Sequence, residues 1–332
     1  MPGSKPSVDP VRWQPPPIEP LPEFGPAELT IVPLPGDQPE DIVVDADGAL
    51  WTGLVDGRIV RIDPDTAATT VVGHTRGRPL GMTVADDGRL LICLSPGGLV
   101  AMDRGTGEID VLVDSVGGRR LQFCSNVVEL PDGTIYFTES TAKWTYQHFK
   151  GGVLEARGDG GLFRRDPDGT VATVLDHLYF ANGLTPTADG SALVFAETQA
   201  RRLSKYWLTG PKAGTVTPLA VNMSGMPDNL STGTDGRIWC AMVSPANAAA
   251  DWLAPRSPLL RKLLWLLPER LQPQIEPVVW AVAFDPDTGA AVAGVRMTRP
   301  DFGMVTGLVE TGGRLWLATI GFSAVAHCPL PR

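Results

Sequence analysis

Short apolar runs alternate with polar residues along most of the chain, and the same arrangement recurs six times. In "PEDIVVDADGALWTG" (39–53), apolar and polar positions alternate up to Asp47-Gly48, and a second, mostly apolar run follows. Such alternation is typical of a half-buried β-strand, and an Asp-Gly pair between two such runs indicates a hairpin. Each repeat therefore predicts a strand, a turn and a second strand. The six turns lie at Asp47-Gly48, Asp87-Gly88, Asp132-Gly133, Asp189-Gly190, Asp235-Gly236 and Gly312-Gly313.

The distance between the repeats predicts an all-β fold, a six-bladed β-propeller. Successive turns are 40, 45, 57, 46 and 77 residues apart, which fits one four-stranded blade each plus insertions. Phrases such as "GRIVRIDPDT" and "WAVAFDPDTG" supply further strands of the same blades. A solenoid would need polar repeats to cap its ends, and none is visible. We expect the ring to be closed by residues 29–34 ("LTIVPL"), paired with the C-terminal strand "AVAHCPL".

Two segments fall outside the repeats. Residues 1–25 are rich in proline and predict an arm that lies on the surface or is disordered, which leaves residues 26–332 for the propeller. A helical insertion is expected at about residues 250–275, because the leucines and the tryptophan of "SPLLRKLLWLLPERLQ" recur at helical spacing. We interpret this helix as a lid packed on the propeller. Contact with a membrane surface is the alternative, because basic residues punctuate the apolar ones.

Composition narrows the classes of partner and compartment. The 332 residues carry a net charge of −9, which argues against nucleic acid as a partner, because phosphates attract basic surfaces. The four cysteines are far apart without a CxxC pair, so we expect reduced thiols. The N-terminus lacks the apolar core of a signal peptide, and no apolar run approaches the roughly 20 residues that span a bilayer. A cytoplasmic location is expected, and the sequence does not indicate an oligomeric state.

Residues just before each inner strand are expected to meet around the propeller axis. Counting seven residues back from the first residue of each turn gives Glu40, Leu80, Ser125, Asn182, Asp228 and Val305. Any one of the polar residues could simply cap a turn, but two carboxylates brought together repel each other unless a cation lies between them. Carboxylate and amide oxygens suit a hard ion, and calcium is favoured over magnesium because it tolerates irregular geometry. The pattern therefore predicts a metal site, with magnesium, manganese or zinc as alternatives to calcium.

Several phrases resemble one family of six-bladed propellers. Pro39-Glu40, "FANGLTP" and "GMPDN" are similar to the SMP-30/gluconolactonase group, and "YFTESTAKW" and "VFAETQARRLSKYWLTGPKAGT" resemble its strictosidine synthase-like branch. The resemblance, over roughly residues 35–328, implies a metal, usually calcium, held by Glu40, Asn182 and Asp228. It also implies a further Asn on the third repeat, where this chain has Ser125-Asn126. Either Asn126 completes the ligands, or Ser125 leaves a looser site with an extra water.

The same resemblance implies hydrolysis of a lactone or related ester. Asp228 is the candidate general base, because a ligand carboxylate lies within reach of the attacking water. Strictosidine synthases carry a catalytic glutamate on the last blade, and the matching residue here is Thr306, which disfavours condensation of an amine with an aldehyde. A condensing enzyme that uses another acid is one alternative, and a non-catalytic propeller that serves as a binding scaffold is the other. No Gly-x-Ser-x-Gly elbow of a serine esterase is present.

The loop "KWTYQHFKGG" after the third repeat supplies the remaining candidates. His148 could relay a proton, as histidines do in related lactonases, or it could be an exposed loop residue. Trp144, Tyr146 and Phe149 could form an apolar wall for the acyl or aryl part of a small-molecule substrate, or could pack between blades. The predicted substrate-binding residues are Ser125, Trp144, Tyr146 and Thr306. The apolar character of the loops favours hydrophobic lactones or aryl esters over sugar lactones.

Overall fold

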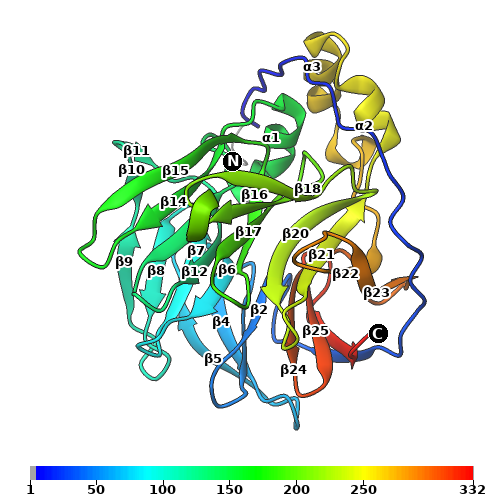
Figure 1. Cartoon of the computed structure of the whole chain (residues 1–332). Helices are drawn as coiled ribbons and strands as arrows, with labels where there is room; N and C mark the ends of the chain where they lie inside the picture. Colours follow the sequence, from blue (N-terminus) through cyan, green and yellow to red (C-terminus); the bar gives the residue numbers. More distant parts are fainter. Residues whose placement is uncertain (1–4, 332) are drawn as a thin grey trace.

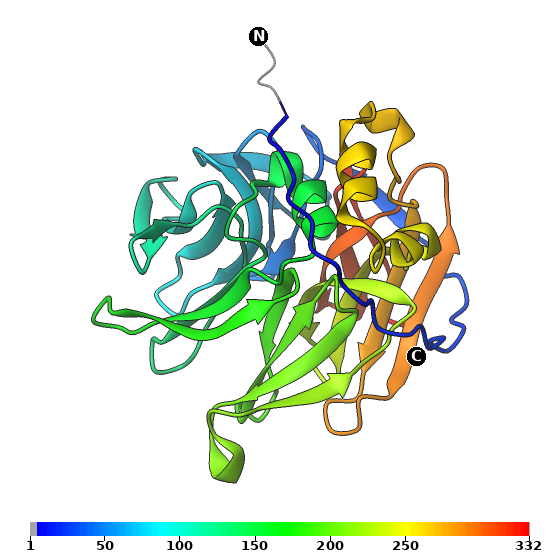
Figure 2. The ribbon, with the colours of Figure 1, turned by 90° about the horizontal axis from the view of Figure 1, so that it is seen from above.

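The predicted propeller is confirmed. A computed structural model describes residues 5–331, and its strands form six four-stranded antiparallel sheets, arranged as blades around an axis (Figures 1 and 2). Each blade begins with its inner strand. Blade 1 consists of β2 (Ile42–Val44), β3 (Leu50–Gly53), β4 (Arg58–Ile62) and β5 (Thr69–His74). Blade 2 consists of β6 (Arg78–Val84), β7 (Leu90–Ser95), β8 (Gly98–Met102) and β9 (Ile109–Val113). Blade 3 consists of β12 (Cys124–Glu129), β13 (Ile135–Glu139), β14 (Gly160–Arg165) and β15 (Val171–Leu178).

Blade 6 is completed by a strand from the beginning of the chain. Blade 4 consists of β16 (Ala181–Pro186), β17 (Ala192–Glu197), β18 (Arg202–Trp207) and β19 (Val216–Ala220). Blade 5 consists of β20 (Gly225–Thr232), β21 (Ile238–Pro245), β22 (Val278–Phe284) and β23 (Ala291–Thr298). Blade 6 consists of β24 (Val305–Thr311), β25 (Arg314–Thr319), β26 (Ala324–Pro329) and β1 (Thr30–Pro33). Strand β1 pairs antiparallel with β26, with Ile31 opposite Ala326. The expected closure between the two ends of the chain is therefore present.

The Asp-Gly turns owe their shape to both residues. The glycines adopt positive φ, for example +84° at Gly88 and +86° at Gly236, a conformation that other residues rarely take. The aspartates accept a hydrogen bond from the backbone two residues further on, at 3.0 Å for Asp87 and 3.1 Å for Asp235. This Asx-type contact fixes the hairpin between the inner strand and the next one.

The hydrophobic core is divided among the interfaces between blades. Within residues 5–331, six clusters of buried apolar residues each join one blade to the next, including blade 6 to blade 1. Trp51, Trp239, Trp280 and Trp316 are among the largest fully buried side chains. Since the faces of every sheet pack against neighbouring sheets, the middle strands are almost continuously buried rather than alternating.

Helices gather at one end of the propeller, above the axis (Figure 1). Helix α1 (Phe149–Glu155) follows β13, while α2 (Ala248–Leu253) and α3 (Pro258–Leu266) lie in the predicted insertion between β21 and β22. Short 3₁₀ turns and a small hairpin complete the elements: η1 (Tyr146–His148), η2 (Gly210–Lys212), η3 (Glu269–Leu271), β10 (Ser115–Val116) and β11 (Arg119–Arg120). In residues 5–331, no helix has the length and apolar character needed to cross a membrane.

The N-terminal arm is tied down across the helices. It runs between α1 and the α2–α3 pair (Figure 2), where the Val11 N–H donates to Glu155 O at 2.9 Å and the Trp13 N–H donates to Ala254 O at 3.2 Å. A seventh apolar cluster joins Val8 of the arm to Trp144, in the loop before α1, and to Trp265 of α3, and Leu154 of α1 packs against it. Of the two expectations for the arm, the described part from residue 5 onward therefore follows the one in which it lies on the surface.

Candidate active site and metal centre

A two-residue irregularity near the start of the inner strands directs side chains toward the axis. In β12 the pairing with β13 shifts between Cys124 and Val127, which leaves Ser125 and Asn126 out of register. The inner strands of blades 2, 4, 5 and 6 show the same shift, and in blade 1 the corresponding residues immediately precede β2. The resulting pairs are Glu40-Asp41, Leu80-Gly81, Ser125-Asn126, Asn182-Gly183, Asp228-Asn229 and Thr306-Gly307.

One of the six positions counted from the sequence was wrong. The count placed Val305 at the axis, whereas the irregularity in β24 lies between Val305 and Leu308 and places Thr306 there. The count was displaced by one residue because the hairpin loop of blade 6 is shorter. Thr311 pairs with Arg314 around a two-residue loop, whereas in blade 1 Val44 pairs with Leu50 around a longer one.

The second residue of each pair follows an alternating rule. Glycine stands there in blades 2, 4 and 6, and a larger polar residue (Asp41, Asn126 or Asn229) stands in blades 1, 3 and 5. A Cβ on Gly183 would lie 2.4 Å from the carbonyl oxygen of Asp228, and one on Gly307 would lie 2.6 Å from Cα of Asp41. Space at the axis therefore admits only three of six side chains, and glycine in alternate blades provides it.

Two of these polar residues, Asn126 and Asn229, form a buried axial network with Glu40. Asn126 Nδ2 donates to Asn229 Oδ1 at 2.9 Å, and Asn229 Nδ2 lies 3.3 and 3.4 Å from the carboxylate oxygens of Glu40. The Asp41 carboxylate accepts from the N–H groups of Ile42 and Met82 at 2.9 and 3.0 Å. Asn229, which the sequence reasoning missed, is the link between Asn126 and Glu40. The feature of the sequence that could have identified Asn229 is its position directly after Asp228 in "GMPDN".

Four residues from the first positions form the floor of a cavity. Glu40, Asn182, Asp228 and Thr306 line it, and each is buried. The Thr306 hydroxyl donates to Glu40 O at 2.6 Å, and Asn182 Nδ2 donates to Thr198 Oγ1 at 3.2 Å. The structure thus brings together three of the predicted ligands and the predicted Thr306 from four separate blades.

Burial alters the acidity of the carboxylates at this floor. Burial, reinforced by the Asp228 carboxylate, raises the pKa of Glu40 well above its ordinary value, and the nearby Arg78 guanidinium opposes the rise. Burial also raises the pKa of Asp228 to about 8 and that of Asp41 to about 7. Arg78 itself is buried, stacks 4.0 Å from the ring of Tyr146, and has a pKa lowered by desolvation.

The donor atoms fit a hard divalent cation. Asp228 Oδ1 is buried and has no hydrogen-bond partner among the described residues, which is the state expected of a ligand oxygen. Across residues 5–331, no three His, Cys, Asp or Glu side chains group into a metal site. The candidate set instead mixes two carboxylates, Glu40 and Asp228, with the carboxamide of Asn182, which is calcium rather than zinc chemistry.

The two remaining candidates on the third repeat lie behind the floor. Ser125 and Asn126 are buried but are not among the residues that line the cavity. The Ser125 hydroxyl is 2.5 Å from that of Ser140, and the Asn126 amide is engaged with Asn229. Both therefore support their neighbours from within the protein.

The cavity above the floor is mainly apolar. It has a volume of about 530 Å³, and its walls include Phe123, Tyr146, Phe149, Phe180 and Met226. Tyr146 thus stands where the prediction of an apolar wall put it.

Two residues of the same loop lie elsewhere. Trp144 packs edge-on against Trp265, with ring centres 5.6 Å apart, and donates Nε1–H to Glu155 at 3.1 Å. His148 precedes α1 and also faces the Trp265 ring, 6.4 Å away. Neither residue lines the cavity. Trp144 therefore supports the helices, and the proton relay by His148 stays a prediction to which its position adds no support.

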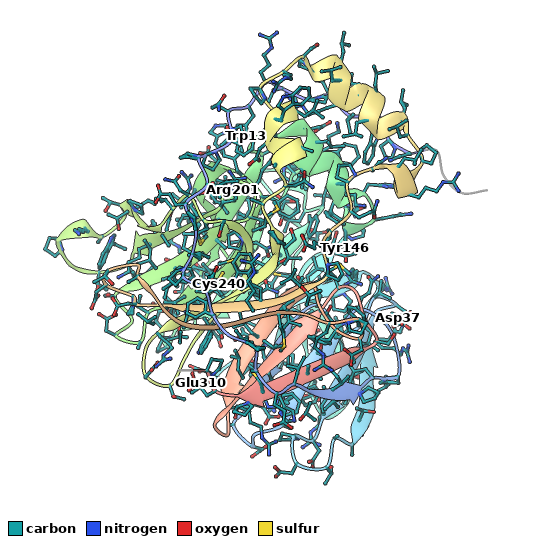
Figure 3. The ribbon with its side chains drawn as sticks, turned by 90° about the vertical axis from the view of Figure 1, so that its right-hand side faces the viewer. Trp13, Asp37, Tyr146, Arg201, Cys240 and Glu310 are labelled. Carbon is teal, nitrogen blue, oxygen red and sulfur yellow. The ribbon has the colours of Figure 1, made fainter. Side chains whose placement is uncertain are left out.

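Two further residues line the cavity although the sequence gave no reason to select them. Trp13 lines the cavity and stacks on Tyr179, with ring centres 5.5 Å apart. Arg201, also in the lining, is buried and binds Asp251 of α2 at 2.8 Å and Pro16 O at 2.5 Å. Figure 3 marks Trp13, Arg201 and Tyr146 between the blades and the helices. Arg201 thus ties the arm and the lid to blade 4.

Comparisons with known proteins agree with this architecture. The family model described as the SMP-30/Gluconolactonase/LRE-like region matches residues 39–250. The chain is 33% identical over 235 residues to strictosidine synthase-like protein 6 of Arabidopsis thaliana, covering 68% of this chain and 62% of that protein. It is 31% identical over 237 residues to the adipocyte plasma membrane-associated protein of Danio rerio, covering 65% and 57%. The matches thus span about three fifths of the length of these relatives.

Solved structures show the same fold at low sequence identity. A gluconolactonase from Xanthomonas campestris superposes with a TM-score of 0.67 at 18% identity, covering 99% of both chains. A structure described as a calcium-binding protein, regucalcin, from Agrobacterium tumefaciens gives a TM-score of 0.65 at 16% identity, covering 94% of this chain and 96% of that one.

Proposed function

The chain belongs to the SMP-30/gluconolactonase/LRE-like family, and from this premise we propose that it is a calcium-dependent hydrolase of hydrophobic lactones or aryl esters. The observation that carries the proposal is the pair of buried carboxylates, Glu40 and Asp228, at the floor of an apolar cavity. The likeness to structures described as a gluconolactonase and as a calcium-binding protein supports the reaction class and the ion.

The proposed ligands are Glu40, Asn182 and Asp228. All three residues line the cavity floor, and calcium is preferred to magnesium, manganese or zinc because the donors are all oxygen and come from three separate blades. A divalent cation bound there would polarise the carbonyl group of a substrate and lower the pKa of a nearby water. Asn126 is proposed as a support, because it holds Asn229 against the Glu40 carboxylate.

In the proposed reaction Asp228 acts as the general base. It accepts a proton from the attacking water while the water oxygen bonds to the acyl carbon, and that proton then passes to the leaving alcohol oxygen as the ester C–O bond breaks. The Asp228 carboxylate has two oxygens, so Oδ1, which has no hydrogen-bond partner among the described residues, would hold the ion while Oδ2 takes the proton. The walls around Tyr146 and Phe149 would hold the acyl or aryl part and exclude bulk water.

A condensing enzyme is the second candidate, because strictosidine synthase-like proteins are among the relatives. The residue at the position of the glutamate expected in strictosidine synthases is Thr306, whose hydroxyl is engaged with Glu40 O. A threonine cannot act as the acid or base that such a condensation needs at neutral pH. Hydrolysis is therefore the better supported reaction, and product analysis with an amine and an aldehyde tests the alternative.

The experiment that tests the proposal measures hydrolysis of a panel of lactones and aryl esters with calcium and with a chelator. Wild type is compared with Asp228→Ala and with the control Asp176→Ala, whose side chain on β15 is 76% exposed. We expect turnover that calcium restores after chelation, loss of turnover in Asp228→Ala, and no effect in the control. Turnover that survives both the chelator and Asp228→Ala would refute the mechanism. Calcium binding without turnover of any panel member would favour the condensing enzyme, and no calcium binding would favour a binding scaffold.

A further inference from the structure

The lid exposes an unusual concentration of large apolar side chains. Of the fourteen large hydrophobic residues that are exposed in residues 5–331, seven fall between positions 252 and 271. The other seven, six valines and one isoleucine, are scattered over the blades and the arm. We name the seven lid residues the lid patch: Trp252, Leu259, Leu260, Leu263, Leu266, Leu267 and Leu271.

The packing of helix α3 on the protein does not explain the apolar residues on its outer face. Its inner face is anchored by Arg261 and Trp265, which are buried, one helical turn apart. Leu259, Leu263 and Leu266 follow helical spacing on the outer face and are 66%, 61% and 77% exposed. A surface helix of a globular protein normally presents polar residues on that side. The apolar outer face therefore points to a partner outside the chain.

The patch is continuous with the cavity below it. Trp252 is 59% exposed and also lines the cavity, as do Leu253 and Leu264 from the same two helices. The helices project from the propeller, away from the blades (Figure 3). A partner seated on the patch would therefore cover the side of the molecule on which the apolar cavity opens.

The charges around the patch identify the partner as anionic. The chain as a whole carries −9, yet residues 252–271 contain Arg256, Arg261, Lys262 and Arg270 against the single acid Glu269. Arg261 is buried and binds the carbonyl of Leu154 at 2.8 Å. Lys262 pairs with Asp9 of the arm at 3.2 Å. Arg256 and Arg270 flank apolar side chains, and Arg256 lies 3.5 Å over the Trp252 ring. Leucines and tryptophan beside Arg and Lys are typical of a helix that lies in a membrane interface.

A second copy of the chain fits this surface less well. A two-fold contact would place each patch on its own counterpart and would bring the same cations face to face. Like charges at such a contact repel, whereas anionic lipid headgroups neutralise them.

We propose that the lid patch docks the protein onto an anionic lipid surface, with the leucines of α3 in the acyl boundary and Arg256 and Arg270 at the headgroups. The docking does not depend on the proposed hydrolysis. It places the apolar cavity next to the lipid phase, from which apolar molecules can enter without crossing water.

The test is flotation of the full chain with vesicles of phosphatidylcholine alone and of phosphatidylcholine with phosphatidylserine. We expect binding to the phosphatidylserine vesicles that weakens as salt is added. The double variant Leu263→Ser/Leu266→Ser should bind about a hundredfold more weakly, because two leucines leave the acyl boundary. Val111→Ser/Val216→Ser, at exposed positions of β9 and β19, is the matched control and should bind like wild type. Arg270→Gln should reduce binding by about fivefold.

Folding of each variant is checked by its circular dichroism and its thermal midpoint, so that lost binding is assigned to the patch. Equal binding to both kinds of vesicle would overturn the charge argument. Absence of binding by wild type, or binding unchanged in the leucine variant, would overturn the proposal as a whole. A concentration-dependent dimer that the leucine variant abolishes, without vesicle binding, would assign the patch to a second copy instead.

Discussion

The buried Asp228 makes the stability of the metal-free protein depend on pH in an unusual direction. Burial raises its pKa from 3.8 to about 8. Between those values the folded protein retains a proton that the unfolded chain has released, so the free energy of unfolding falls as pH rises. Glu40 and Asp41 are shifted the same way and act with the same sign. Carboxylates that form salt bridges have the opposite effect.

The magnitude follows from the number of protons held. Each proton retained only by the folded state lowers the free energy of unfolding by roughly 1.4 kcal/mol per pH unit. Asp228 alone therefore accounts for a loss of about 3 kcal/mol between about pH 5 and pH 7. Asp228→Asn should remove this part of the slope in a chelator. At neutral pH the variant should be more stable than metal-free wild type, and calcium should reverse that order, because the ion binds the ionised carboxylates.

Urea denaturation at several pH values, with chelator or with calcium, measures these slopes. Asp176→Asn is the control, because its carboxylate is exposed on β15 and its removal leaves the cavity floor intact. A wild-type protein whose metal-free stability is flat or rises from about pH 5 to pH 7 would refute the reasoning. The reasoning would also be refuted if the free energy of unfolding of Asp228→Asn fell with pH as steeply as that of the wild type.

Three further substitutions test the packing around the site. Gly183→Ala places a Cβ 2.4 Å from the Asp228 carbonyl oxygen. We expect it to lower the free energy of unfolding by about 1–3 kcal/mol and to weaken calcium binding measured by calorimetry. The control Gly25→Ala, whose Cβ would lie in open space, should change neither quantity. Asn229→Ala breaks the axial network and should lower the free energy of unfolding by about 1–3 kcal/mol in urea denaturation, and a loss below the error of the measurement would contradict the network. Trp13→Ala enlarges the cavity and should raise KM for aryl esters about tenfold with little change in kcat; an unchanged KM would exclude Trp13 from the substrate wall.

The repeat pattern was sufficient to predict the blades because one physical requirement recurs in each. A half-buried strand, a tight turn and a buried strand must alternate in every blade, so the sequence shows the same phrase six times. Glu40, Asn182 and Asp228 could be grouped because pseudo-symmetry converts equal distance from a turn into a shared place at the axis. The same counting failed at Val305, since the hairpin of blade 6 has a shorter loop. Turn length, rather than position in the chain, sets the register.

The cavity walls could not be predicted in the same way. Trp13 reaches the cavity through the path of an irregular arm, whose local sequence carries no periodicity to extrapolate. Trp144 and His148 looked equivalent to Tyr146 in one loop, yet both face Trp265, whereas Tyr146 lines the cavity. Such directions depend on contacts with Trp265, more than a hundred residues away in the sequence. Tertiary packing of this kind has no local signal.

The pairing of β1 with β26 also governs when the protein can finish folding. During synthesis β1 must wait without its partner until His327, opposite Thr30, has emerged. Until then the blade 1 face that packs against Trp316 is exposed, and such open edges favour aggregation. The hydrogen bond from Thr306 to Glu40 O forms across the same seam. The proposed ligand site is therefore completed last, and calcium binding to it during refolding would report the moment at which the ring closes.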